Sequence, residues 1–192
     1  MKRIAVLFAF FACFAVPAAR AQNHVEVGAF AEYFRLNETS TNLVGLGARA
    51  GVNVNKYFQL EAEMGYDFTR AFSESFTNPT AQVVTIQRSN LHALHGLFGP
   101  KLQTGGRVRA FVTVKGGFEN FSINNRPGTF AGFTSSVNDL RTNNVSGVLY
   151  PGGGLEAFIG PIGLRLDVGD EIYFAGGAHN NWKVSFGPTI RF

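Results

Sequence analysis

The segment WKVSFGPTIRF, residues 182–192, decides the fold class of this chain. Because a β-strand points alternate side chains to opposite faces, the segment has one apolar face and one polar face. The apolar face holds Trp182, Phe186 and the terminal Phe192, whereas the polar face holds Lys183 and Arg191. This alternation is typical of the closing strand of a barrel that has lipid outside and a wet interior.

The N-terminus is typical of an exported protein. Two basic residues are followed by a mostly apolar run over residues 4–16 and by the A-x-A sequence of residues 19–21. We therefore expect residues 1–21 to be a secretory signal peptide that is cleaved before Gln22. A retained membrane anchor is the alternative, but the run over residues 4–16 is shorter than the roughly 20 apolar residues that a membrane helix needs.

The net charge changes once the signal peptide is set aside. The chain has 17 basic and 13 acidic residues, and three of the basic residues precede Gln22, so that 14 remain. No basic cluster is left that could hold a phosphate backbone, and we expect no nucleic-acid partner. The single cysteine, Cys13, also precedes Gln22, so we expect neither disulfides nor thiol chemistry in residues 22–192.

Period-2 alternation predicts eight strands in residues 22–192. They span residues 24–35, 43–54, 58–69, 89–103, 108–119, 146–158, 163–174 and 182–192. The register of the fourth and sixth strands stays open, because both alternate poorly. The pattern predicts a single all-β domain, an eight-stranded antiparallel up-and-down transmembrane β-barrel.

The connections between these strands alternate in length. Three are short, at residues 55–57, 104–107 and 160–162, and four are longer, at residues 36–42, 70–88, 120–145 and 175–181. A barrel with both termini on the periplasmic side has short periplasmic turns and longer external loops. We therefore expect the four longer connections to lie outside the cell.

Most charged residues of the predicted strands fall on the inward parity. Sixteen of the 18 point inward, and only Arg35 and Asp170 point outward. The predicted interior charge network comprises Arg49, Glu61, Glu63, Asp67, Arg109, Lys115, Glu119, Arg165, Asp167, Lys183 and Arg191, with Glu26, Glu32, Lys101, Glu156 and Glu171 on the same inward parity. An apolar exterior around a charged interior suits a bilayer, where a basic residue facing lipid costs about 2–4 kcal/mol. A soluble lipocalin-like binder would show the reverse.

Three positions carry specific expectations. Arg35 should reach lipid phosphates at the external surface, and Asp170 should lie at the external interface or be turned inward by a bulge. Loss of Lys115 or Arg109 should leave interior carboxylates such as Glu61 or Glu119 uncompensated.

The chain resembles the small outer-membrane barrels of the OmpA and OmpX type. Residues 97–102 (LFGPKL) and 152–154 (GGG) are similar to the broad outer membrane protein beta-barrel domain group. The resemblance implies the outer membrane of a Gram-negative-type bacterium, contact with its lipid, and a terminal aromatic, Phe192, that the outer-membrane assembly machinery reads as a signal. OmpA proteins usually add a peptidoglycan-binding domain, but the resemblance covers only the barrel, so tethering to the cell wall is not carried over.

Residues that could carry chemistry have simpler explanations. Glu61 and Glu63 share a strand face, and we expect them to pair with interior cations rather than to act as a hydrolytic acid and base. His92 and His95 face opposite sides of one strand and cannot jointly bind a metal without a bulge. None of the four histidines is followed by serine at the second position, as the lipid A deacylase type of barrel requires. We predict no catalytic, metal or cofactor site.

The leading hypothesis is therefore an outer-membrane barrel with a structural or surface-interaction role. Envelope integrity, adhesion or contact with an unknown surface ligand through external loops would all fit this role. Eight strands enclose a lumen that side chains fill, so a wide pore is disfavoured. A lipid A-modifying barrel enzyme and a soluble periplasmic lipocalin-like barrel remain the alternatives.

Overall fold

The computed structural model describes residues 24–78, 80, 82–124, 134–135, 137 and 145–192. The predicted signal peptide lies outside these residues, as does most of the predicted loop 120–145. The strands are β1 (Val25–Leu36), β2 (Thr41–Asn53), β3 (Phe58–Asn78), β4 (Val83–Gln103), β5 (Val108–Asn124), β6 (Thr134–Ser135), β7 (Val145–Ile159), β8 (Ile162–Phe174) and β9 (Ala178–Arg191).

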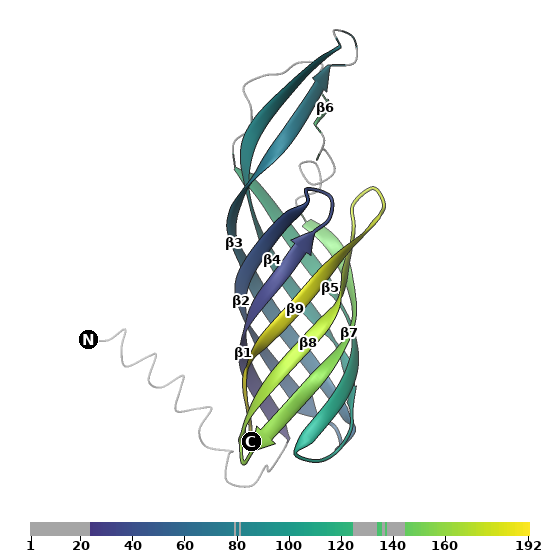
Figure 1. Cartoon of the computed structure of the whole chain (residues 1–192). Coiled ribbons are helices and arrows are strands. Elements are labelled where there is room, and N and C mark those ends of the chain that lie inside the picture. The colour runs from purple at the N-terminus through teal and green to yellow at the C-terminus, as the bar shows by residue number, and fades with distance from the viewer. Residues whose placement is uncertain (1–23, 79, 81, 125–133, 136, 138–144) are drawn as a thin grey trace, which may run out of the picture.

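Eight of these strands form a closed antiparallel barrel, as predicted. Each barrel strand pairs with its sequence neighbour among the eight, β9 returns to pair with β1, and β2 pairs with β3. Figure 1 shows the strands tilted around one closed wall. The two-residue strand β6 is an addition to the edge of β3, where it pairs with Phe76 and Thr77. Closure leaves the eight-stranded wall without a free edge.

The strands β3 and β4 are longer than predicted. Residues 70–88, expected as a loop, continue the ladder from Arg70↔Leu91 to Asn78↔Val83. The register shifts between Asp67 and Arg70, which marks a β-bulge at the base of this extension. The hairpin rises above the other strands in Figure 1.

The expected contrast in connection length is therefore wrong for three external connections. The strands β1 and β2 are separated only by residues 37–40, and β8 and β9 only by residues 175–177. Paired strands replace the predicted loops because backbone hydrogen bonds continue beyond the alternating apolar pattern. The alternating pattern in the sequence indicates which part of a strand faces lipid, but it does not indicate where the backbone pairing of that strand ends.

No helix among the described residues is long and apolar enough to cross a membrane.

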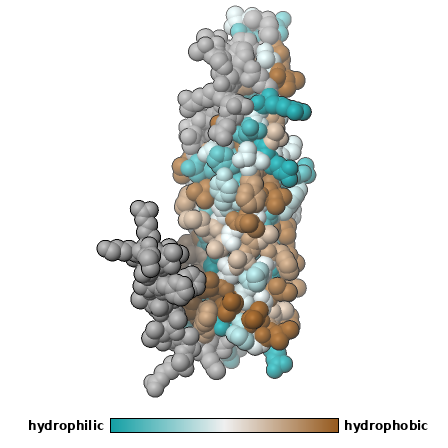
Figure 2. Space-filling model, turned by 90° about the vertical axis from the view of Figure 1, so that its left-hand side faces the viewer, coloured by the Kyte–Doolittle hydropathy of each residue, from teal (hydrophilic) through white to brown (hydrophobic). Residues whose placement is uncertain are grey.

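Alternate residues of each strand face outward, and the outward set is mainly apolar. Val112 and Val114 of β5 are more than half exposed, whereas their neighbours Thr113 and Lys115 are buried. Burial also gives the register of the fourth and sixth predicted strands, which the sequence left open. The strand β4 points His95 and Lys101 inward, and β7 points Glu156 inward. Figure 2 shows apolar side chains over the wall of the barrel, with hydrophilic side chains gathered above them.

The two outward charges lie in one row across three strands. Trp182 of β9 pairs with Arg35 of β1 on one side and with Asp170 of β8 on the other. The β8–β9 register is continuous through this row, so no bulge turns Asp170 inward. Its carboxylate accepts hydrogen bonds from Asn180 Nδ2 and Asn181 N, both 2.8 Å long, at the start of β9. Asp170 therefore lies in the upper, external part of β8, as the first of the two expected placements requires.

Candidate functional site

The most distinctive site is the interior of the barrel, which begins at the periplasmic mouth with an ion-paired layer. Arg109 Nη1 lies 2.7 Å from Glu26 Oε1, and Lys101 Nζ lies 2.7 Å from Glu156 Oε1. Lys101 also approaches Glu26 at 3.6 Å. These side chains come from β1, β4, β5 and β7, so one layer ties four strands together across the lumen.

The next layer is centred on the two glutamates of β3. Glu61 pairs with Arg165, which donates from both Nη atoms, and with Lys115. Glu63 Oε2 lies 2.6 Å from Lys115 Nζ, and Glu63 Oε1 lies 3.1 Å from Lys183 Nζ. Both carboxylates are therefore held by cations, which leaves neither free to act as a general acid or base.

Arginines of this layer also pack on aromatic rings. The guanidinium of Arg165 lies 4.2 Å from the ring centroid of Phe111, and that of Arg49 lies 4.3 Å from the centroid of Phe30. Arg165 Nη2 contacts Asp167 at 2.6 Å. A planar guanidinium group can stack on an aromatic ring and donate hydrogen bonds to a carboxylate at the same time, whereas the ammonium group of lysine has no planar face to stack.

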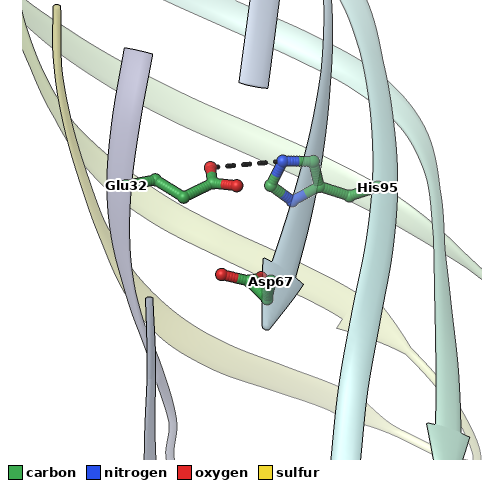
Figure 3. Close-up of side chains that lie close together, drawn as sticks. All are labelled: Glu32, Asp67 and His95. Atoms are coloured by element: carbon green, nitrogen blue, oxygen red, sulfur yellow. Dashed lines mark ion pairs between the residues drawn. The ribbon is translucent and has the colours of Figure 1, made fainter. Parts of the chain in front are cut away.

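Above these pairs lies an acidic layer around His95. His95 Nδ1 is 3.1 Å from Glu171 Oε1, and its Nε2 is 3.3 Å from Glu32 Oε2. Figure 3 shows Glu32, Asp67 and His95 pointing toward one another from β1, β3 and β4. Among the described residues, neither oxygen of Asp67 nor of Glu119 has a hydrogen-bond partner.

The external end of the interior is apolar. Its buried side chains are Phe34, Leu36, Leu43, Phe72, Leu91, Ala93, Leu97, Phe121, Val137, Val148, Tyr150, Tyr173 and Ala175. We call this set the upper cluster. Sequence alternation missed it, because inward apolar residues such as Phe34 and Leu43 break the simple charged-inside pattern.

The structure brings together most of the predicted interior network but leaves some members apart. Arg49, Glu61, Glu63, Lys115, Arg165, Asp167 and Lys183 share one continuous set of contacts. Arg191 stands at the periplasmic rim, where its Nε donates to Gly160 O, and Arg109 contacts Glu26 rather than Glu61. Among the described residues, Lys115 contacts Glu61 and Glu63 rather than Glu119, so of the two carboxylates named for it, Glu61 is the one that its loss would leave less compensated.

Sequence reasoning did not include His95 in the interior network. The signal was present, because His95 shares the parity of Lys101 along β4. His92 faces the other way, where its ring lies 5.8 Å from that of Tyr66. Residues 152–154 of β7, all glycines, serve close packing: a Cβ on Gly154 would collide with Leu166 O and the ring of Phe111.

The interior is filled rather than open. Tyr150, Phe121, Lys115 and His95 are each at most 1% exposed. One cavity of about 430 Å³ lies at the periplasmic mouth, beside Lys56, Arg109 and Arg191. The barrel is therefore not a wide pore.

An apolar wall around a charged and filled interior defines an integral membrane β-barrel. The chain matches the family described as "Outer membrane protein beta-barrel domain" over residues 6–187. The protein belongs to this family and is an outer-membrane protein.

Solved structures of small outer-membrane barrels share the fold. The N-terminal β-barrel domain of OprF from Pseudomonas aeruginosa superposes with a TM-score of 0.53 at 14% identity, covering 89% of this chain and 98% of that one. Ail, the attachment invasion locus protein of Yersinia pestis, in complex with the heparin analogue sucrose octasulfate, gives 0.51 at 13% identity, with coverages of 88% and 96%. Neisserial surface protein A also has a TM-score of 0.51 at 13% identity, covering 88% of this chain and 96% of that one. No curated protein matches this chain by sequence.

Proposed function

We propose that this protein is a non-conducting outer-membrane anchor whose external β3–β4 hairpin contacts a partner outside the cell. One observation carries the proposal. The strand β3 pairs with β2 only as far as Asp67, and β4 pairs with β5 only from Asn90 onward, yet β3 and β4 remain paired to Asn78↔Val83. A paired hairpin that leaves the barrel wall is a preorganised surface for contact, because little ordering entropy is lost when it binds.

The side chains of the hairpin support a contact role. Val84 and Ile86 are 60% and 69% exposed, and Arg70 and Arg88 are also exposed. Exposed aliphatic and cationic groups on one rigid element suit a mixed apolar and anionic partner. Ail was solved with a sulfated heparin analogue, and heparin is therefore a reasonable first probe here.

The test is to replace residues 73–88 with an Asn-Gly turn, which keeps the Phe72↔Ser89 pair and closes the hairpin near the barrel rim. We expect cells that carry the shortened protein to lose surface adhesion and heparin binding while the barrel still assembles. Assembly is checked by the difference in gel migration between boiled and unboiled protein. Unchanged adhesion would contradict the proposal, and a loss of envelope integrity alone would point to a structural role.

A finer test uses the two exposed aliphatic residues of the hairpin, Val84 and Ile86. Val84→Ser with Ile86→Ser should weaken adhesion, because it removes the apolar part of the hairpin surface. Val54→Ser is the matched control, since Val54 is also 60% exposed but lies beside the periplasmic turn after β2. Equal effects of the two changes would exclude a specific contact at the hairpin.

Export and assembly belong to the same proposal. Residues 1–21 would direct secretion and be removed, and Phe192 would be recognised by the outer-membrane assembly machinery.

We infer no catalytic activity, and the engagement of Glu61 and Glu63 in ion pairs supports this. Purified protein in planar bilayers should show no large conductance steps, because buried side chains fill the lumen.

A further inference from the structure

The acidic layer of the interior has too little positive charge around it. The carboxylates of Glu32, Asp67, Glu119 and Glu171 share this layer with one imidazole, His95, and one ammonium, Lys183, and each of the six residues is at most 2% exposed. In the layer below, Glu61 and Glu63 alone contact four cations: Lys101, Lys115, Arg165 and Lys183, the last shared with the acidic layer. A buried carboxylate without a compensating charge or hydrogen bond is costly. The acidic layer therefore calls for further positive charge, either as protons or as a bound cation.

We propose that Glu32, Asp67 and His95 bind a divalent metal ion of the Zn²⁺ class inside the barrel. One ligand atom from each residue can be chosen so that all three lie within 4.8 Å of one another. The three side chains converge in Figure 3. One imidazole nitrogen with two carboxylate oxygens is a donor set that suits zinc and similar ions.

The buried oxygens of Asp67 are an independent sign of a ligand. Asp67 is 1% exposed, and neither of its oxygens has a hydrogen-bond partner among the described residues. Both oxygens of Glu32 also lack a hydrogen bond there, although Glu32 Oε2 lies near His95 and Lys183. Buried polar atoms of native proteins are nearly always satisfied, so these atoms call for a partner.

His95 is oriented as a metal-binding histidine would be. If its Nδ1–H donates to Glu171 Oε1 at 3.1 Å, its Nε2 presents a lone pair toward Glu32. Metal-bound histidines characteristically donate their other N–H to a carboxylate in this way. A cation between Nε2 and Glu32 also removes the repulsion between that lone pair and the carboxylate.

Two inward glycines let the proposed ligand side chains pack directly against the backbone. A Cβ on Gly65 would collide with His95 Nε2 and Glu32 Oε1, and a Cβ on Gly45 would lie 2.7 Å from Asp67 Oδ1 and 2.9 Å from Glu32 Oε1. Both glycines therefore face the proposed ligand atoms. Any larger residue at Gly65 would displace His95 and Glu32 from their present positions.

Lys183 is the competing cation, and its other contacts limit this competition. Its Nζ lies 3.2 Å from His95 Nε2 but also 3.0 Å from Glu171 and 3.1 Å from Glu63. Those two carboxylates can hold the ammonium when a metal takes Nε2. The second buried acidic group, Glu61, Glu63 and Asp167, differs because Lys115, Arg165 and Arg49 already fill it. We therefore assign no metal to that group.

The experiment is to refold the full mature chain with Zn²⁺ present, because the closed layer must be loaded during folding. After passage over a chelating resin, elemental analysis should find about one zinc per chain, in line with three converging ligands. His95→Gln and Asp67→Asn should abolish retention, and Glu171→Gln should weaken affinity roughly 10- to 100-fold. His92→Gln is the matched control on the outer face of the same strand and should retain zinc as the unchanged protein does.

Each outcome bears on the proposal. No zinc on the unchanged protein overturns it and means that protons or Lys183 neutralise the layer. Zinc that persists in both His95→Gln and Asp67→Asn also overturns it. If these variants do not fold, X-ray absorption of zinc on the unchanged protein decides: imidazole and carboxylate ligation supports the site, and ligation without imidazole overturns it.

Discussion

The lower and upper halves of the barrel interior are built from opposite chemistry. Toward the periplasm, cations such as Arg165 and Lys115 pair with glutamates across the lumen. Toward the outside, the upper cluster packs Phe34, Leu91 and Phe121 with almost no exposure. The bilayer constrains only the outer wall. The interior can therefore be filled either by ion pairs or by apolar packing, provided that its buried polar groups have partners. The upper cluster also keeps external water from the ion pairs, which strengthens their attraction.

Breaking the ion-paired half should have the largest effect. Arg165→Met removes the cation that Glu61, Glu156 and Asp167 share. Loss of one member of a buried pair leaves unpaired charge and should lower the free energy of unfolding by about 3–5 kcal/mol. Urea unfolding of refolded protein in lipid vesicles measures the change, and a loss below about 1 kcal/mol would mean that water reaches this layer.

Two variants sharpen this result. Arg165→Lys keeps the charge but loses the two-pronged contact with Glu61, so it should recover only part of the stability. Arg109→Ala should cost less than Arg165→Met, because Arg109 lies at the periplasmic mouth, where its side chain is 8% exposed. The same or greater cost at Arg109 would remove the distinction between mouth and centre.

The apolar half should respond to lost volume rather than to lost charge. Leu91→Ala should cost about 2–5 kcal/mol in urea unfolding, because it opens a cavity in the upper cluster. Leu91→Met, which conserves volume, should cost less than about 1.5 kcal/mol. If both changes cost the same, packing is not what stabilises this half.

The outer face beside the upper cluster should be much more tolerant. Asp170→Ala removes an acceptor for Asn180 and for the backbone of Asn181. The expected loss is about 0.5–1.5 kcal/mol, measured by the same unfolding experiment. A loss as large as that of Arg165→Met would place Asp170 inside a network that the contacts do not show.

Phe192→Ala should have the smallest effect on stability and the clearest effect on assembly. The backbone of Phe192 pairs with Val25 and His24, and its side chain is 43% exposed, so a substitution keeps the pairing that a deletion would remove. Outer-membrane abundance by cell fractionation should fall while unfolding in urea changes little. Unchanged abundance would show that the terminal ring is only part of the lipid-facing surface.

The outward face and the fold were predictable from particular strands. In residues 58–69 and 108–119, the outward parity is apolar and the inward parity is mainly polar, with Phe111 as an apolar exception, and the structure confirms which parity faces out. The length of β3 and β4 was not predictable, because the pairing of Arg70–Asn78 with Val83–Leu91 depends on backbone bonds rather than on a lipid-facing pattern.

The amino-acid sequence by itself determined the barrel, its strand number and the side of the wall that meets lipid, because a bilayer imposes a strict period-2 pattern on every strand that crosses it. Only the tertiary structure decided which interior charges meet. Glu32, Asp67 and His95 come from three strands and converge through the closure and register of the barrel. Parity states that a side chain points inward, but its neighbours across the lumen depend on strand stagger and tilt, which no local pattern encodes.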